Sequence, residues 1–396
     1  MTVRVNKSSF NIREKLSELE RPIGLKGSEL MRSETVQDAR DLVSAGRKNL
    51  IINGAMQVAQ RGTSATSGPN GTGEGYTTLD RWHNSMNHGT AATTFSQSTD
   101  APSGFGYSLK YEVTTAQSTL SSSEFWILSH RLEGQHLQSI GKGTSDAKQL
   151  TLSFWVKATK TGTNNVELFD VDNSRLTTKQ FTVNTSNTWE HKTLVFDADT
   201  TGAFDNDTSR SFQVQWWISA GTNWTSGSVT SWASEVAANR APSQVNNLDT
   251  IGNVFQITGV QLEVGKNATE FEHRSYGEEL ALCQRYYAVL GTTSQPSPCP
   301  VFSRAAATKV MGIDLPVPMR ATPTAGTAGT VRILRGGSYV ESNSSMVINS
   351  VTPTIYLGGS MTRLSIWWNS NLTSVTNTAN DVYGGFSSGI AFSAEL

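Results

Sequence analysis

Charged residues are scarce in this sequence of 396 residues. Asp, Glu, Lys and Arg together make up 16% of the chain, and the formal net charge is −1. Soluble proteins average about 25% charged residues. A chain so near neutrality has no strong electrostatic attraction to nucleic acid or anionic lipid, so we expect neither as a partner.

Long apolar runs, cysteines and repeats are also rare or missing. No apolar run approaches the roughly 20 residues of a membrane span, and no apolar leader follows the first basic residues. We therefore expect neither secretion nor membrane insertion. The two cysteines, Cys283 and Cys299, are expected to be free thiols in a protein assembled in a reducing cytoplasm. No internal repeat or heptad pattern is evident.

Motifs for catalysis and zinc binding are not found either. The sequence has no GxSxG, P-loop or GxGxxG motif. None of its six histidines has the helical spacing of a zinc protease; they are His83, His88, His130, His136, His191 and His273. Glu133 and Glu263 would act as a glycosidase pair only at a separation of about 5–9 Å. We expect no enzyme, no catalytic residue and no bound metal.

Calcium binding is the one alternative to the absence of a metal, because the sequence has two acidic turns. Such turns bind Ca²⁺ in jelly rolls, but more often they are solvated Asx turns. The residues concerned are Asp170, Asp172 and Asn173 in one turn, and Asp197, Asp199, Asp205 and Asp207 in the next.

Apolar residues alternate with polar ones through most of the chain after residue 49. In SFQVQWWIS, for example, Phe212, Val214 and Trp216 share one face while Gln213 and Gln215 share the other. Many short strands joined by Gly, Asn, Asp and Thr turns predict an antiparallel sandwich, most simply a jelly roll. The predicted strands are 107–113, 124–132, 150–158, 165–171, 178–184, 191–197, 211–219 and 254–264. Residues 125–128 are apolar at every position, which favours a strand buried on both faces, with a neighbouring subunit as one candidate cover.

The strand at 254–264 changes phase at a glycine. Phe255 and Ile257 alternate before Gly259, whereas Val260 and Leu262 form the apolar set after it. A glycine at such a change predicts a β-bulge. A helix follows, with Leu280, Cys283 and Tyr287 at helical spacing.

The first 48 residues differ in composition and predict two short amphipathic helices. Their apolar stripes are too small to fold alone, so they need a partner surface. That surface belongs either to another protein or to another copy of this chain in a trimer; folding back on the chain's own β domain is the alternative. The stripe residues are Ile12, Leu16 and Leu19 in the first helix, and Val36, Leu42 and Val43 in the second.

The chain is thus mainly β, with four predicted parts. They are a helical segment at 1–48, a jelly-roll-like sandwich at 49–273, a linking helix at 274–290 and a smaller C-terminal β domain at 291–396. The proline-rich run LPVPMRATPT at 315–324 is an edge or connector rather than a central strand.

Aromatic side chains are the remaining candidates for ligand binding, because flat rings stack on the apolar faces of sugars. The sequence has ten tryptophans. Core or subunit-interface packing is the competing interpretation of each. The candidate ligand-binding residues are Trp155, Trp217, Trp224, Trp232, Trp367 and Trp368.

Three groups of residues resemble two classes of known proteins. The run GVQLEVG–ATEFEHRS–ELALCQRYY within 254–287, followed by LPVPMRATPT, resembles a segment of tail-fibre and other receptor-binding structural proteins of tailed bacteriophages. NLIINGAMQVAQRGTS at 49–64, with LDRW at 79–82, is a looser match to the same proteins. The order of HRLEG, LTLSFWVKA and SFQVQWWIS is similar to jelly-roll carbohydrate-binding modules, on strand pattern and a few aromatics.

The resemblance implies a tail-fibre-like virion protein, assembled in the host cytoplasm as a homotrimer. Residues 1–48 would attach it to other virion proteins of the tail or capsid, and its β domains would contact host-surface polysaccharide. A capsid-decoration or head-fibre protein without receptor binding is one alternative. A polysaccharide-degrading tailspike is another.

Overall fold

The computed structural model describes Arg32 and residues 47–69, 71–229 and 231–290. In the C-terminal part it describes 299–305, 308–325, 331–335, 338–341, 348–353, 363–369, 382–386 and 390–396, with side chains only at 314–324 and 391–396. The predicted helices of residues 1–48 and their stripe residues lie outside the described residues.

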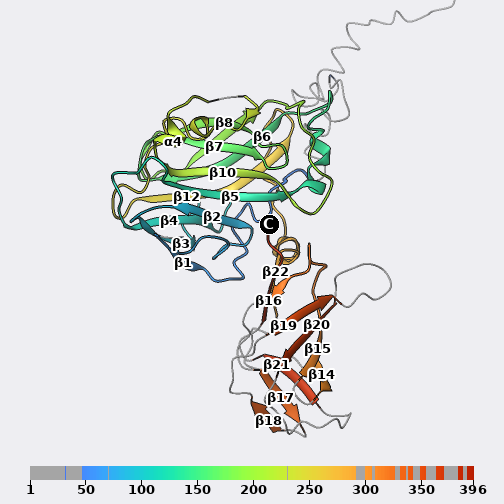
Figure 1. Ribbon diagram of the computed structural model, residues 1–396. Coiled ribbons are helices and arrows are strands. Elements are labelled where there is room, and N and C mark those ends of the chain that lie inside the picture. The colour runs from blue at the N-terminus through green and yellow to red at the C-terminus, as the bar shows by residue number, and fades with distance from the viewer. Residues whose placement is uncertain are drawn as a thin grey trace, which may run out of the picture.

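Two six-stranded antiparallel sheets form a sandwich, seen with one sheet in front of the other in Figure 1. We name each sheet after a central strand. The β12 sheet has the order β1 (Ser64–Ser67), β3 (Ala92–Ser98), β4 (Ser108–Thr115), β12 (Val254–Val264), β6 (Leu150–Ala158) and β9 (Glu190–Phe196). The β10 sheet has the order β11 (Ala233–Ser234), β8 (Arg175–Val183), β7 (Gly162–Asp170), β10 (Arg210–Ala220), β5 (Phe125–Glu133) and β2 (Trp82–Asn87).

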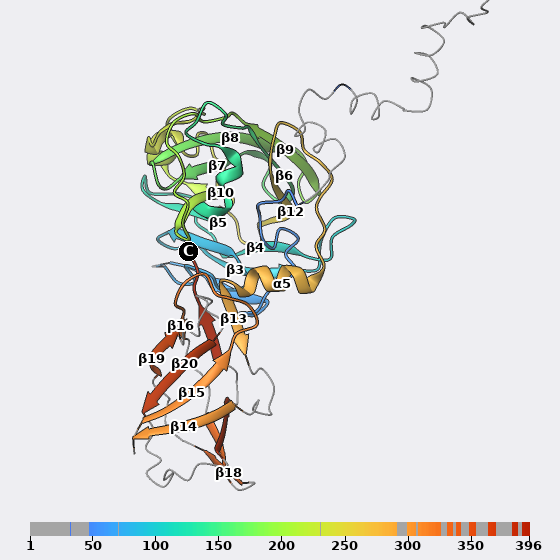
Figure 2. The same cartoon turned by 90° about the vertical axis from the view of Figure 1, so that its right-hand side faces the viewer.

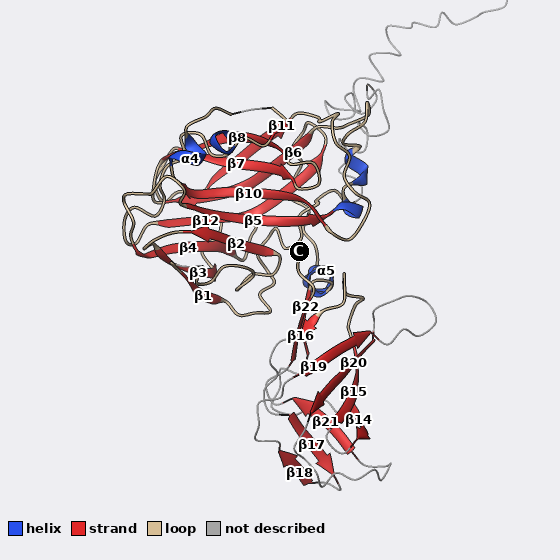
Figure 3. Cartoon of the chain, viewed as in Figure 1, coloured by secondary structure: helices blue, strands red, loops and turns tan. Residues whose placement is uncertain are grey.

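Successive strands pass repeatedly from one sheet to the other, which makes the sandwich jelly-roll-like, as the sequence predicts. Figure 3 shows how little helix the described residues contain. None of those helices is long and apolar enough to cross a bilayer.

The core lies between the sheets and follows the predicted alternation. Trp216 from β10 packs against Phe154 from β6, with ring centroids 5.7 Å apart. In β12, Phe255, Ile257, Val260 and Leu262 all enter the core. The register shifts between Thr258 and Gln261, and Gly259 has a φ of +60°, so the predicted bulge is confirmed.

The loop 221–253, which includes α4 (Thr222–Thr225), covers part of the outer face of the β10 sheet. Trp126 and Leu128 of β5 belong to the central core, whereas Ile127 joins Trp217 and Ala241 in a second apolar cluster. The strand is therefore buried on both faces, as predicted. Its outer face is covered by the loop 221–253 of the same chain, whereas the sequence suggests a neighbouring subunit as one candidate cover.

The helix α5 (Tyr276–Gln284) lies between the sandwich and the C-terminal strands (Figure 2). It is shorter than the predicted linking segment, because residues 287–290 form a strand, β13 (Tyr287–Leu290), paired with β22 (Ile390–Ser393) and followed in that sheet by β16 (Thr324–Ala325). Cys283 is a buried free thiol, as expected; the side chain of Cys299 lies outside the described residues.

A second C-terminal sheet has seven strands. Its order is β18 (Ser338–Glu341), β17 (Val331–Arg335), β21 (Val382–Phe386), β14 (Cys299–Ala305), β15 (Thr308–Asp314), β20 (Arg363–Asn369) and β19 (Ile348–Pro353).

Candidate functional site

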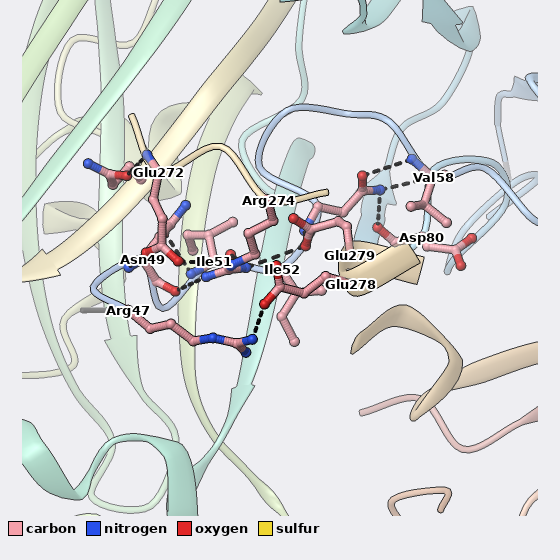
Figure 4. Close-up of polar contacts among 12 residues, drawn as sticks. Arg47, Asn49, Ile51, Ile52, Val58, Asp80, Glu272, Arg274, Glu278 and Glu279 are labelled. Carbon is pink, nitrogen blue, oxygen red and sulfur yellow. Dashed lines mark hydrogen bonds and ion pairs between the residues drawn. The ribbon is translucent and has the colours of Figure 1, made fainter. Parts of the chain in front are cut away.

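The two stretches that resemble phage fibre proteins meet in one junction, beside the β12 sheet and α5 (Figure 4). Asn49 lies at its centre: its Nδ2 donates to Val260 O at 3.1 Å, and its Oδ1 accepts from Leu262 N at 3.1 Å. The backbone N–H groups of Lys48 and Asn49 both donate to Glu272 Oε2 at 2.8 Å. Burial alone would raise the pKa of Glu272, but these two donors and Arg274 hold it below its ordinary value.

Arg274 and Glu279 satisfy the rest of this backbone. Arg274 donates to Ile51 O at 3.1 Å and to Asn49 O at 2.6 Å. Glu279 Oε1 accepts from Asn53 N at 2.6 Å. Buried backbone groups without partners are costly, so residues 49–53 are held in place by side chains more than 200 positions away.

Asn53 connects the junction to the sandwich through hydrogen bonds. Its Nδ2 donates to Val58 O at 2.8 Å and to Asp80 O at 2.9 Å, and its own carbonyl accepts from Trp82 Nε1 at 3.1 Å. Asp80 and Trp82 are the ends of the LDRW motif.

Two arginines connect the same motifs to the end of α5. The Arg81 guanidinium lies 3.5 Å from the Tyr286 ring centroid, and that of Arg61 lies 3.5 Å from the Tyr287 ring. Burial raises the pKa of Asp80 to about 6, although Arg61 and Gln60 oppose this. Each motif is visible in the sequence, but no local pattern indicates that the motifs pack on one another.

The outer face of the β10 sheet carries a buried ion pair beneath the covering loop. Glu167, fully buried, accepts from Arg240 Nε at 2.8 Å and from Trp217 Nε1 at 3.1 Å. Burial raises the pKa of Glu167, and Arg240 opposes that rise. Trp217, predicted as a ligand platform, is only 1% exposed, so its ring is inaccessible.

Beside this pair, a row of four side chains crosses the same face. We call Phe169, Gln213, Arg131 and His83 the polar row. Gln213 lies in register with Phe169 of β7 on one side and with Arg131 of β5 on the other. Arg131 Nη2 lies 3.3 Å from His83 Nδ1. Phe169 and Arg131 are half-buried, whereas Gln213 and His83 are each only 7% exposed. Arg131 Nη1 also donates to Leu396 O at 2.7 Å, and the Arg240 guanidinium lies 5.1 Å from the Phe169 ring centroid.

The polar row combines uncharged hydrogen-bonding groups with one positive charge. Burial, with Arg131 and Arg210 nearby, lowers the pKa of His83 to about 3, so its ring is neutral at physiological pH. A neutral imidazole, an amide and a guanidinium together offer both donors and acceptors beside an aromatic ring. Alternation in SFQVQWWIS predicts the outward position of Gln213, but no local pattern indicates its neighbours on β5 and β7.

Trp155 is a half-buried ring on the outer face of the β12 sheet, 5.2 Å from the His191 ring. It is on the opposite side of the sandwich from the polar row.

Trp224 and Trp232 are half-buried, and both belong to the loop 221–253 that covers the β10 sheet. The Trp224 ring lies 5.6 Å from Phe125, and its Nε1 donates to Ser123 O. Trp232 Nε1 donates to Asp197 O at 2.8 Å. Trp367 and Trp368 lie in β20, and their side chains are outside the described residues.

The acidic turns surround a lysine. Lys142 Nζ lies 2.5 Å from Asp170 Oδ2, 3.0 Å from Asp199 Oδ2, 2.9 Å from Thr201 O and 2.7 Å from Gly202 O. Two of the residues considered for calcium therefore do meet, but around an ammonium group. Among the described side chains, no three His, Cys, Asp or Glu form a possible metal-ligand group.

The other acidic residues of these turns mostly order the backbone. Asp172 accepts from Asp205 N at 3.0 Å, and Asp207 accepts from Ser209 N at 2.8 Å.

Glu133 and Glu263 lie on different sheets with different partners. Glu133, at the end of β5, accepts from Arg285 at 3.0 and 2.8 Å. Glu263, in β12, accepts from Thr269 N at 3.1 Å. Each carboxylate is thus engaged separately.

Comparison with known proteins finds similar folds at low identity. No protein-family model matches the chain, and no curated protein matches its sequence. Among solved structures, the enzymatically active domain of tailspike protein 4 from bacteriophage CBA120 is 14% identical; the match covers 55% of this chain and 21% of that one, with a TM-score of 0.29.

Carbohydrate-binding modules give similar values. The family 11 module from Clostridium thermocellum, in complex with a β-1,3-1,4-mixed-linked tetrasaccharide, is 12% identical, covering 49% of this chain and 91% of that one at a TM-score of 0.26. TmCBM61, in complex with β-1,4-galactotriose, is 7% identical, covering 56% and 100% at 0.26. The likeness concerns the sandwich and assigns neither family nor ligand.

Proposed function

We propose that this chain is a tail-fibre-like structural protein of a phage virion. It attaches to the particle through residues 1–48 and contacts host-surface glycan through its sandwich. The observation that carries the proposal is the junction: Asn49 and Glu272, from two separate stretches that resemble phage fibre proteins, are directly hydrogen-bonded. A resemblance in two distant stretches has more weight when their residues form a single interface.

The polar row is the proposed glycan surface. Sugar hydroxyls need donors and acceptors close to an apolar ring. Gln213 is placed for this role because it lies in register between Phe169 and Arg131, with 7% of the residue exposed.

Homotrimer formation rests on the resemblance alone. The doubly apolar strand β5, which favoured a neighbouring subunit, is covered by the chain's own loop. The capsid-decoration alternative shares the same anchor and body but needs no glycan surface. A tailspike enzyme is the weaker alternative, because Glu133 and Glu263 have separate partners.

The test compares the full-length protein with a form beginning at Arg47. This start retains Lys48 and Asn49, whose amides bind Glu272. Binding to host cells and their extracted surface polysaccharide is measured by sedimentation, and attachment to particles lacking the protein is measured in parallel. We expect the shortened protein to bind polysaccharide fully but to lose particle attachment.

A Phe169→Ala/Gln213→Ala variant of the full-length protein locates the glycan surface. It should attach to particles normally and bind polysaccharide about tenfold more weakly, which corresponds to 1.4 kcal/mol. Particle attachment without polysaccharide binding by the unmodified protein would favour decoration instead. Depolymerisation of the polysaccharide would favour the tailspike alternative.

A further inference from the structure

Five rings form a strip on the outer face of the β12 sheet. We call Phe105, Trp155, His191, Phe271 and His273 the aromatic strip. Phe105 lies 5.0 Å from Phe271 and 5.4 Å from His273, centroid to centroid. Trp155 and His191 are the other pair, 5.2 Å apart. The rings come from four separate segments: a loop before β4, the neighbouring strands β6 and β9, and the segment after β12.

The Gly259 bulge brings the two parts of the strip together. A Cβ at Gly259 would lie 2.6 Å from Phe105 Cζ and 3.1 Å from Trp155 Cδ1. The glycine therefore lets both rings close onto the same point of the backbone. Its φ of +60° also favours glycine.

The strip is accessible. Phe105, Trp155 and Phe271 are half-buried, and His191 and His273 are exposed. In contrast to Trp217 on the other sheet, these rings are not buried beneath a described loop.

Its surroundings are polar without excess charge. Lys157 Nζ lies 2.7 Å from Asp100 Oδ2, and Asp100 Oδ1 also accepts from Trp189 Nε1 at 3.2 Å. Burial lowers the pKa of His191, so its imidazole is neutral at physiological pH. Such a surface offers rings and uncharged hydrogen-bonding groups, which match a neutral sugar and provide no attraction for a polyanion.

We propose that the aromatic strip is a second carbohydrate-binding surface, which stacks on the pyranose rings of a neutral polysaccharide. It lies on the sheet opposite the polar row, so one sandwich would contact two glycan segments. This inference deepens the proposed glycan binding and uses a separate set of residues.

The test is electrophoresis of the full-length protein in native gels containing hydroxyethylcellulose, barley β-glucan or dextran, with alginate as an acidic polymer. Phe105→Ala/Trp155→Ala should weaken retardation by at least one neutral polymer about tenfold, as expected from losing two ring contacts. His191→Ala, an exposed position, should weaken it by a smaller factor and guards against misfolding of the double variant. Circular dichroism and light scattering are recorded for each protein.

The Phe169→Ala/Gln213→Ala variant separates this inference from the proposed polar row. If it alone loses retardation, the polar row binds and the aromatic strip does not. If only the strip variants lose it, the inference stands and the polar row fails. The inference is overturned if the unmodified protein is not retarded by any neutral polymer. It is also overturned if the strip variants change the oligomeric state without changing retardation, since the strip would then be a subunit interface.

Discussion

At the scale of single residues, Lys142 is the clearest case of a side chain that holds distant segments together. Its ammonium contacts two carboxylates and two carbonyl oxygens, and its side chain is only 2% exposed. Burial would raise the pKa of Asp199, but hydrogen bonds from Arg175 and Lys142 hold it below its ordinary value. Phe204 and Trp232 add cation–π contacts at 5.2 and 5.3 Å.

Lys142→Met should therefore destabilise the sandwich strongly. Asp170, whose side chain is fully buried, would lose its cation, and removing one partner of a buried pair costs about 3–5 kcal/mol. Urea unfolding at neutral pH measures the loss. Lys148→Met is a control that leaves the ammonium of Lys142 in place; an equal effect from both substitutions would contradict this account.

At the scale of elements, the sequence predicts the strands well because alternation is a local property. The faces of β6, β10 and β12, and the bulge at Gly259, follow directly from it. It could not predict what covers those faces. Glu167 and Arg240 are 73 positions apart, so no local pattern indicates that Trp217 lies beneath a loop. Long-range packing also accounts for the end of α5 before the predicted position. The helix ends at Gln284, and Tyr286 beyond it packs against Arg81.

The junction supplies the prediction at this scale. Glu272→Ala removes the acceptor of two backbone N–H groups at 2.8 Å, and hydrogen bonds to charged groups contribute about 1.5–3 kcal/mol each. We expect faster hydrogen exchange in residues 47–56 and a melting temperature several degrees lower. Glu270→Ala, an exposed neighbour, is the matched control. Unchanged exchange at 47–56 in Glu272→Ala would show that this carboxylate does not secure the junction.

At the scale of the whole molecule, residues 394–396 return to the sandwich and fasten the C-terminal strands to it. Glu395 Oε1 lies 3.0 Å from Arg61 Nη2, and its other oxygen pairs with Arg81. Arg320 donates to Glu395 O at 2.9 Å and to Thr208 O, in the sandwich, at 2.7 Å. Arg61 and Arg81 also stack on Tyr287 and Tyr286, respectively. The contact made by residues 394–396 and the junction therefore share these two arginines. A force on the C-terminal strands would therefore reach the segment that leads to residues 1–48.

Glu395→Gln should weaken this connection. The side chains of Arg81 and Glu395 are 1% and 8% exposed, and breaking so buried a pair costs about 3–5 kcal/mol. Hydrogen exchange should rise first in residues 287–290 and 390–396, then in 47–56, while β10 remains protected. Glu235→Gln is the matched control, because it breaks a pair with Arg240 at 3.0 Å whose carboxylate side chain is 36% exposed, and exposed pairs contribute about 0–1 kcal/mol. If exchange rises in the C-terminal strands and not in 47–56, the two contacts are independent, and the C-terminal strands do not transmit force to the anchor.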